Sequence, residues 1–136
     1  MTKGLWLNLP VKDIEASKKF FAAIGFAINE DRSNATMAAV FVGTDKCPVM
    51  LFQEETLKEV MQAEVSDATK AGEVMISFDA STREEIDEMA ERVAAAGGNV
   101  WSKPAEIQGW MYGFAFSDPD GHRWNMLYMD NAKMKG

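Results

Sequence analysis

The same order of secondary-structure elements is predicted twice along the chain, and this repeat limits the folds open to it. Each half reads as a strand, an amphipathic helix and three more strands. Helices are expected at 13–24 and 81–96, and strands are expected near 4–11, 26–29, 36–42 and 48–53, then at 73–79, from 99, at 111–116 and from 122. No glycine-rich phosphate loop follows a strand. Short, mainly antiparallel strands packed with helices indicate an α+β fold.

Capping residues mark the start of both predicted helices. Asp13 precedes the apolar periodicity of the first helix, so its carboxylate can accept hydrogen bonds from first-turn amides. Ser81 and Glu84 have the three-residue spacing of a capping box before the second helix. Glycines follow both helices at 25 and 97–98 and are expected to end them.

The clearest turn is the sequence Asp-Pro-Asp-Gly at 118–121, which leads into the last predicted strand. Alternation along that strand predicts one face formed by Trp124, Met126 and Tyr128. The other face then holds Arg123, Asn125, Leu127 and Met129. His122, the single histidine, is expected near the turn or in solvent, and no Ser-His-Asp or Cys-His set can be assembled around it.

The 136 residues are expected to form one domain with two halves, at about 1–66 and 72–136. The segment 54–72 differs in character from both halves. Its first part has the apolar spacing of a short helix, and its last part is turn-like. We interpret it as a linker, with a flap over a pocket as the alternative.

Composition excludes several classes of function. An apolar fraction of 47% is sufficient for a core, and the net charge of −7 disfavours binding to nucleic acid or anionic membranes. No apolar run has the length of a membrane span. Cys47 is the only cysteine, so no intrachain disulfide can form, and a cytoplasmic location is expected.

Several segments together resemble the glyoxalase/bleomycin-resistance family of the vicinal oxygen chelate superfamily. They are residues 7–13 before an aromatic-rich helix that ends in Phe20-Phe21-Ala22-Ala23-Ile24-Gly25-Phe26, residues 93–98, and the turn at 118–121. The likeness spans nearly the whole chain. It implies paired βαβββ modules whose curved sheets enclose a cavity, usually in a homodimer.

Metalloenzymes of that family take one ligand from each of four strands, commonly His or Gln, Glu, His and Glu. Matching the motifs places these positions at Trp6, Leu51, Glu73 and Asn125, with Gln53 reached by a slip of one or two residues. Trp6 and Leu51 cannot ligate, and a transition metal needs three or more converging donors. The resemblance therefore implies a site with no metal and no cofactor.

Without a metal, the resemblance implies a ligand pocket of apolar and aromatic walls with a few polar anchors. Its expected residues are Trp6, Asn8, Leu51, Gln53, Glu73, Met75 and Asn125, with Leu127 beside them and Trp110 and Tyr112 at the mouth. Ordinary core packing is the alternative for the Met and Trp side chains. Glu73 is either a solvated carboxylate at the rim or an acid–base group in the pocket.

The leading hypothesis is metal-independent binding of a small, partly apolar or aromatic molecule. The runner-up is a lyase, isomerase or dioxygenase of the same superfamily. Such an enzyme would need metal ligands other than the matched residues, or acid–base chemistry by Glu73. A protein that binds a partner and keeps only a remnant of the pocket is the third possibility. The resemblance also implies a homodimer.

Overall fold

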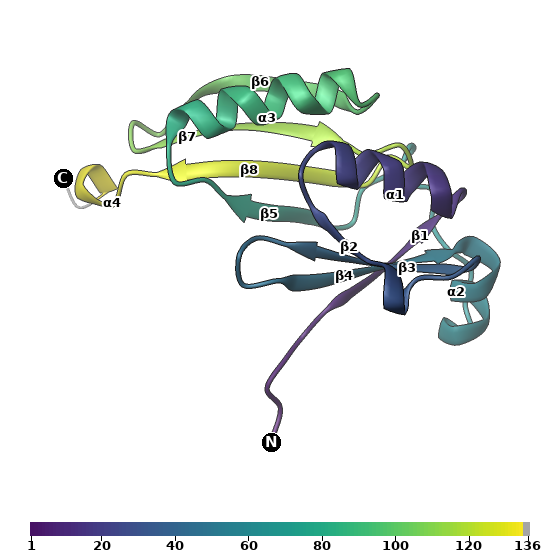
Figure 1. Ribbon diagram of the computed structural model, residues 1–136. Helices are drawn as coiled ribbons and strands as arrows, with labels where there is room; N and C mark the ends of the chain where they lie inside the picture. Colours follow the sequence, from purple (N-terminus) through teal and green to yellow (C-terminus); the bar gives the residue numbers. More distant parts are fainter. Residues whose placement is uncertain (135–136) are drawn as a thin grey trace. The chain divides into compact units, whose positions relative to one another are not determined.

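The computed structural model describes residues 1–134, which fall into two compact units, Met1–Asp67 and the described residues from Ala68 onward (Figure 1). The first unit contains β1 (Leu7–Val11), α1 (Ile14–Ala23), β2 (Ala27–Asn29), a 3-10 turn (Glu30–Arg32), β3 (Met37–Val42), β4 (Cys47–Gln53) and α2 (Glu54–Met61). Its sheet has the order β1-β4-β3-β2. The β1–β4 pair is parallel and the other pairs are antiparallel.

The second unit repeats this topology. It contains β5 (Met75–Asp79), α3 (Arg83–Ala95), β6 (Asn99–Ile107), β7 (Met111–Ser117), β8 (Arg123–Met129) and the short α4 (Asn131–Met134). The sheet order is β5-β8-β7-β6, again with a parallel pair of first and last strands. The predicted α+β fold with paired βαβββ modules is confirmed. No helix within residues 1–134 is long and apolar enough to span a membrane.

One predicted cap is confirmed and the other is wrong by one residue. Asp13 caps α1, and its carboxylate accepts a hydrogen bond from the Ala16 amide at 3.1 Å. The cap of α3 is Thr82, whose hydroxyl accepts from the Glu85 amide at 3.2 Å, while the Ser81 amide donates to the Glu85 carboxylate at 2.8 Å. The sequence offers two overlapping pairs with the same spacing, and the helix uses the second because it begins at Arg83.

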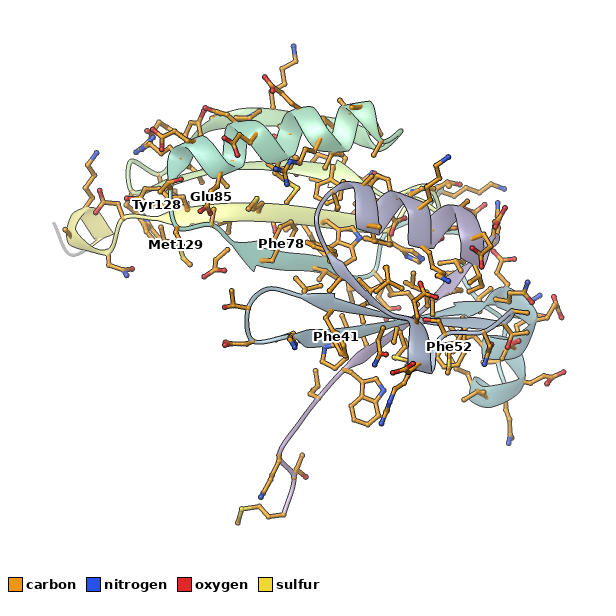
Figure 2. All side chains as sticks on the ribbon, viewed as in Figure 1. Phe41, Phe52, Phe78, Glu85, Tyr128 and Met129 are labelled. Atoms are coloured by element: carbon orange, nitrogen blue, oxygen red, sulfur yellow. The ribbon has the colours of Figure 1, made fainter. Side chains whose placement is uncertain are left out.

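The core of the second unit lies between α3 and one face of its sheet (Figure 1). Trp124 of β8 pairs in register with Phe116 of β7, and both side chains are fully buried with their rings stacked at 6.2 Å. The ring of Phe78, labelled in Figure 2, lies 6.1 Å from that of Trp124. The alternation predicted for the last strand is therefore confirmed on its buried side.

A buried carboxylate organises the turn at 118–121. The Asp118 side chain accepts hydrogen bonds from the amides of Asp120 and His122, both at 3.0 Å, and from the Trp124 indole at 3.1 Å. Asp118 is 5% exposed, and this burial raises the pKa of its carboxyl group. The turn is thereby tied to the core through the indole of β8.

Asp118→Ala is expected to lower the free energy of unfolding by about 1–3 kcal/mol, because buried donors lose their acceptor. Urea denaturation followed by tryptophan fluorescence measures the change. Asp45→Ala, in the exposed turn between β3 and β4, is the matched control and is expected to change stability by less than about 0.5 kcal/mol. Equal effects of the two substitutions would contradict a structural role for Asp118.

Candidate functional site

A cavity of about 200 Å³ lies on the face of the β5–β8 sheet that α3 does not cover. All the residues that line it belong to the second unit: Met75, Trp101, Ser102, Lys103, Ala105, Ile107, Gly113, Phe114, Ala115, Asn125 and Leu127. Most of the wall is apolar, with Asn125, Ser102 and Lys103 as polar groups. This composition is typical of a small-molecule site.

Strand alternation places the side chains of the cavity wall. Asn125 and Leu127 alternate with the buried Trp124 and Met126 along β8, so they point to the uncovered face. Asn125 pairs in register with Ala115 of β7, and Met75 lies beside them on β5 in parallel register with Arg123. Three neighbouring strands thus contribute to one surface.

Small residues on β7 leave room above this surface. A Cβ atom added to Gly113 would lie 2.6 Å from the carbonyl oxygen of Met126 and 2.6 Å from the Leu127 side chain, so only glycine fits there. Ala115, two residues further, adds a single methyl group. The depression therefore depends on two residues that carry almost no side chain.

Irregular pairing brings Trp101 of β6 to the same site. The register between β6 and β7 shifts between Val100 and Ser102 and again between Ser102 and Ala105. Trp101 is 41% exposed, and the guanidinium group of Arg123 lies 4.8 Å from the centroid of its ring. Neither Trp101 nor Lys103 was among the expected site residues, because the bulges that position them leave no readable period in the sequence.

The polar groups of the cavity are oriented by contacts on the sheet. The Ser77 hydroxyl of β5 donates a hydrogen bond to the Asn125 side-chain oxygen. This contact leaves the Asn125 amide nitrogen, with its two N–H donors, as the part able to contact a ligand. The side-chain nitrogen of Asn125 makes no hydrogen bond to any of residues 1–134.

The expected site residues of the second unit separate into three groups. Met75, Asn125 and Leu127 line the cavity. Glu73 is exposed in the bend before β5, and Trp110 is half-buried in the turn between β6 and β7, where its carbonyl oxygen accepts from the Asp130 amide at 2.8 Å. Tyr112, in contrast, lies on the face covered by α3.

The placement of Tyr112 corrects the expectation that it would stand at the mouth of the pocket. Its hydroxyl donates to Asp87 of α3 at 2.7 Å, and the Arg83 guanidinium lies 5.0 Å from its ring centroid. The hydrogen bond to Asp87 raises the pKa of Tyr112. Tyr112 alternates in phase with Phe114 and Phe116, so it must share their face.

In the first unit, the expected residues lie on β1, on β4 and just before β1. Trp6 is 58% exposed, Asn8 is exposed on β1, and Gln53 is half-buried at the end of β4. Leu51 is fully buried and pairs in register with the buried Leu9 on β1, on the face covered by α1. Leu51 is therefore a core residue of its unit. Convergence of Trp6 with Glu73 and Asn125 stays a prediction.

The repeated topology gives a second way to find equivalent strand positions. Leu9 lies four residues before the cap of α1, and Phe78 lies four residues before the cap of α3, so the two positions are equivalent. Leu9 pairs with Leu51 and Phe78 pairs with Met126, so these partners are equivalent as well. The position equivalent to Asn125 is then Met50, one residue from Leu51. By the same alignment Met75, rather than Glu73, corresponds to Trp6.

These positions do not suit the metal centres that the resemblance implies. Trp6, Met50, Met75 and Asn125 supply no imidazole and no carboxylate, which hard and borderline divalent metals require. Within residues 1–134, no three His, Cys, Asp or Glu side chains gather as a metal site. The described residues therefore do not fit such a centre.

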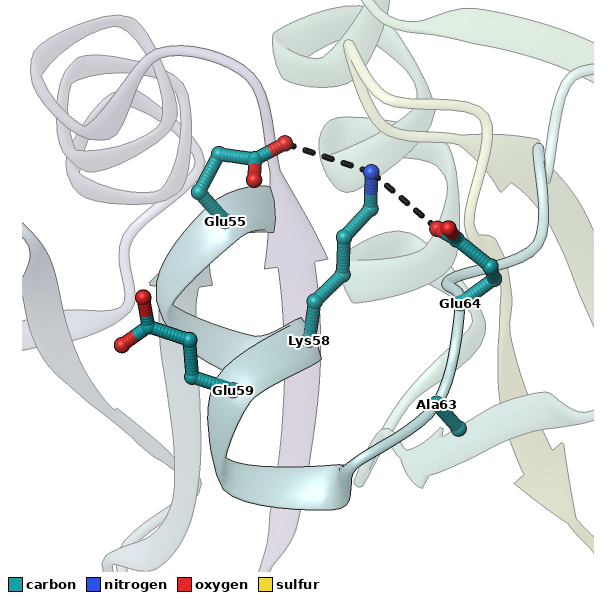
Figure 3. Close-up of a pocket in the computed structure, with 5 residues that line it drawn as sticks. All are labelled: Glu55, Lys58, Glu59, Ala63 and Glu64. Carbon is teal, nitrogen blue, oxygen red and sulfur yellow. Dashed lines mark hydrogen bonds and ion pairs between the residues drawn. The ribbon is translucent and has the colours of Figure 1, made fainter.

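A second concavity, of about 370 Å³, lies against α2 in the first unit (Figure 3). Lys58 lies at its centre and makes ion pairs of 3.2 Å with both Glu55 and Glu64. The hydrogen bond to Glu55 raises the pKa of Lys58. The remaining wall is Glu59 and Ala63. Because its one cation is already paired and its walls are acidic and solvated, this concavity is the weaker candidate.

Comparison with known proteins agrees with the fold. A sequence model of the Glyoxalase/Bleomycin resistance protein/Dioxygenase superfamily matches residues 5–126. No curated protein matches the chain. Among solved structures, hypothetical protein SA1046 from S. aureus is 38% identical with a TM-score of 0.82, and the match covers 94% of each chain.

More distant structures share the fold. A glyoxalase/bleomycin resistance protein/dioxygenase family enzyme from Burkholderia phytofirmans PsJN is 22% identical, with a TM-score of 0.78 over 91% of this chain and 96% of that one. The fosfomycin resistance protein FosX from Listeria monocytogenes, solved with Mn(II) and sulfate, is 20% identical, with a TM-score of 0.70 over 95% and 92%. The family match over most of the chain and the repeated βαβββ topology together show that the chain belongs to the glyoxalase/bleomycin resistance/dioxygenase superfamily.

Proposed function

We propose that this protein binds a small, partly apolar or aromatic molecule in the cavity of the second unit, without a metal ion. The observation that carries the proposal is the cavity wall, which combines Trp101, Met75 and Leu127 with the Asn125 amide. Aromatic and apolar surfaces supply affinity, and a single oriented amide supplies direction. Methionine adds a side chain that adapts to different shapes.

The size of the cavity limits the ligand. Sites for drug-sized molecules have volumes of about 300–1,000 Å³. A volume of about 200 Å³ suits one ring or a fused pair of rings. The rings would lie against Trp101, where aromatic stacking is favourable.

The alternative function is that of a superfamily enzyme. It would use Glu73 for acid–base catalysis, or it would bind a metal through residues other than the four matched strand positions. The exposed position of Glu73, two residues ahead of the cavity residue Met75, supports a solvated carboxylate. Binding is therefore the better supported function. Sharing a fold with superfamily enzymes does not imply sharing their activity, because activity depends on the side chains of the site.

Filling the cavity is expected to abolish binding. Ala105 lines the cavity and is exposed, so Ala105→Phe occupies the site without disturbing the core. Binding of indole and indole-3-acetamide is measured by titration of the amide resonances of Gly113, Ala115 and Asn125. The dissociation constants are expected to rise by at least about tenfold, the equivalent of 1.4 kcal/mol.

Ala94→Phe is the matched control, since Ala94 is exposed on α3 and absent from the cavity wall. It is expected to leave both dissociation constants unchanged. Resonance shifts that avoid the cavity residues, or no shifts with either compound, would refute the proposed site.

Metal binding is tested with Ni²⁺, Zn²⁺ and Fe²⁺. Wild type and Glu73→Gln are expected to retain equal, substoichiometric metal after gel filtration, measured by plasma emission. Lactoylglutathione lyase activity is expected to be absent with each metal, because a catalytic centre ordinarily needs three protein donors. Stoichiometric metal that is lost on changing Glu73 would support the enzyme alternative.

Assembly is a further part of the proposal. Each four-stranded sheet has two edge strands, and closing open sheets against a second copy is a common way to protect such edges. A two-fold homodimer with a total interface above about 1,000 Å² is expected. Sedimentation velocity at micromolar concentration measures it, and a monomer would contradict the expectation.

A further inference from the structure

Two cations lie at the cavity of the second unit in a chain whose net charge is −7. Among residues 1–134, Lys103 is the only charged residue that lines the cavity. Arg123 lies two residues before Asn125 on β8, so the two side chains share a face of the sheet. Its guanidinium lies 4.8 Å from the ring centroid of Trp101, which lines the cavity. Within residues 1–134, neither cation forms an ion pair.

Within residues 1–134, three other cations are engaged by carboxylates. Lys18 lies 3.0 Å from Glu30, Lys58 bridges two glutamates, and Arg83 pairs with Glu106. The acidic groups near the cavity, Asp79 on β5 and Glu73 before it, make no ion pair with Arg123 or Lys103. The site therefore keeps its positive groups available, although acidic residues outnumber basic ones by 21 to 14 in the chain.

The polar groups of the cavity are also mainly donors. The Ser77 hydroxyl occupies the Asn125 oxygen, so Asn125 presents N–H groups. A lysine ammonium and an arginine guanidinium can only donate. A ligand that matches this set carries acceptors and negative charge, and an ionised acid group satisfies both requirements.

We propose that the ligand is an aromatic carboxylate, with its ring against Trp101 and its acid group bound by Arg123, Lys103 and the Asn125 amide. This inference rests on the proposed binding function and narrows its ligand class. Trp101 holds the guanidinium in place through a cation–π contact, which leaves the N–H fork of Arg123 able to pair with two carboxylate oxygens. The aromatic wall and the charged groups thus recognise two parts of one molecule.

Two compounds with the same ring distinguish the contribution of charge to binding from the contribution of shape. Indole-3-acetate and indole-3-acetamide differ in the acid group alone, and their dissociation constants are measured by calorimetry at low salt. The acid is expected to bind about 10- to 100-fold more tightly, because hydrogen bonds to charged groups are stronger than neutral ones. The preference is expected to shrink as salt is added.

The double variant Arg123→Gln and Lys103→Gln is expected to reduce this preference to within about twofold, because the acid group then loses both of its cationic partners. The matched control, Arg92→Gln and Lys3→Gln, removes two exposed cations that form no ion pair within residues 1–134. Both double variants change the net charge equally. The control is expected to keep the preference.

The outcomes distinguish this inference from the function on which it rests. If neither compound binds, the proposed function fails and the ligand class fails with it. If both compounds bind wild type equally, the binding function stands and the anionic class is overturned. A preference that is lost equally in the control would also overturn it, since net charge rather than Arg123 and Lys103 would then explain the effect.

Discussion

The two-residue period of β8 is the constraint on which the second unit depends. Trp124 and Met126 are buried against the face that α3 covers, and the Trp124 indole also donates to the buried Asp118 of the preceding turn. With these side chains held, Asn125 and Leu127 must point to the uncovered face. A shift of one residue would exchange the two sets, placing an amide in the core and an indole on the surface. Core packing and the site are thus two consequences of one register.

The two units share a topology and differ in the chemistry of their uncovered faces. In the first unit, alternation places Met50, Phe41 and Phe52 on that face, and Figure 2 labels the two phenylalanines. In the second unit, the equivalent surface carries Asn125 hydrogen-bonded to Ser77. The two units therefore share a topology without sharing a binding site.

Membership of the superfamily describes the scaffold, and the side chains decide what the scaffold does. Superfamily metalloenzymes use donors on strands equivalent to β1, β4, β5 and β8. Here the register leaves tryptophan, methionine and asparagine at the corresponding positions. In the second unit, the cavity wall with Trp101, Met75 and Asn125 suits the proposed ligand, with the cations Arg123 and Lys103 nearby.

The sequence by itself determined the order of the elements, the fold class and the two faces of the last strand, because periodicity and turn chemistry are local properties. It also identified Met75 and Asn125, which line the cavity. Tertiary structure decided which of two adjacent caps begins α3, that Tyr112 bonds to Asp87, and that Leu51 belongs to the core. It also decided the bulges of β6 that bring Trp101 over to Arg123. Each of these depends on pairing between distant segments, and a one-residue difference in register reverses the face to which a side chain points.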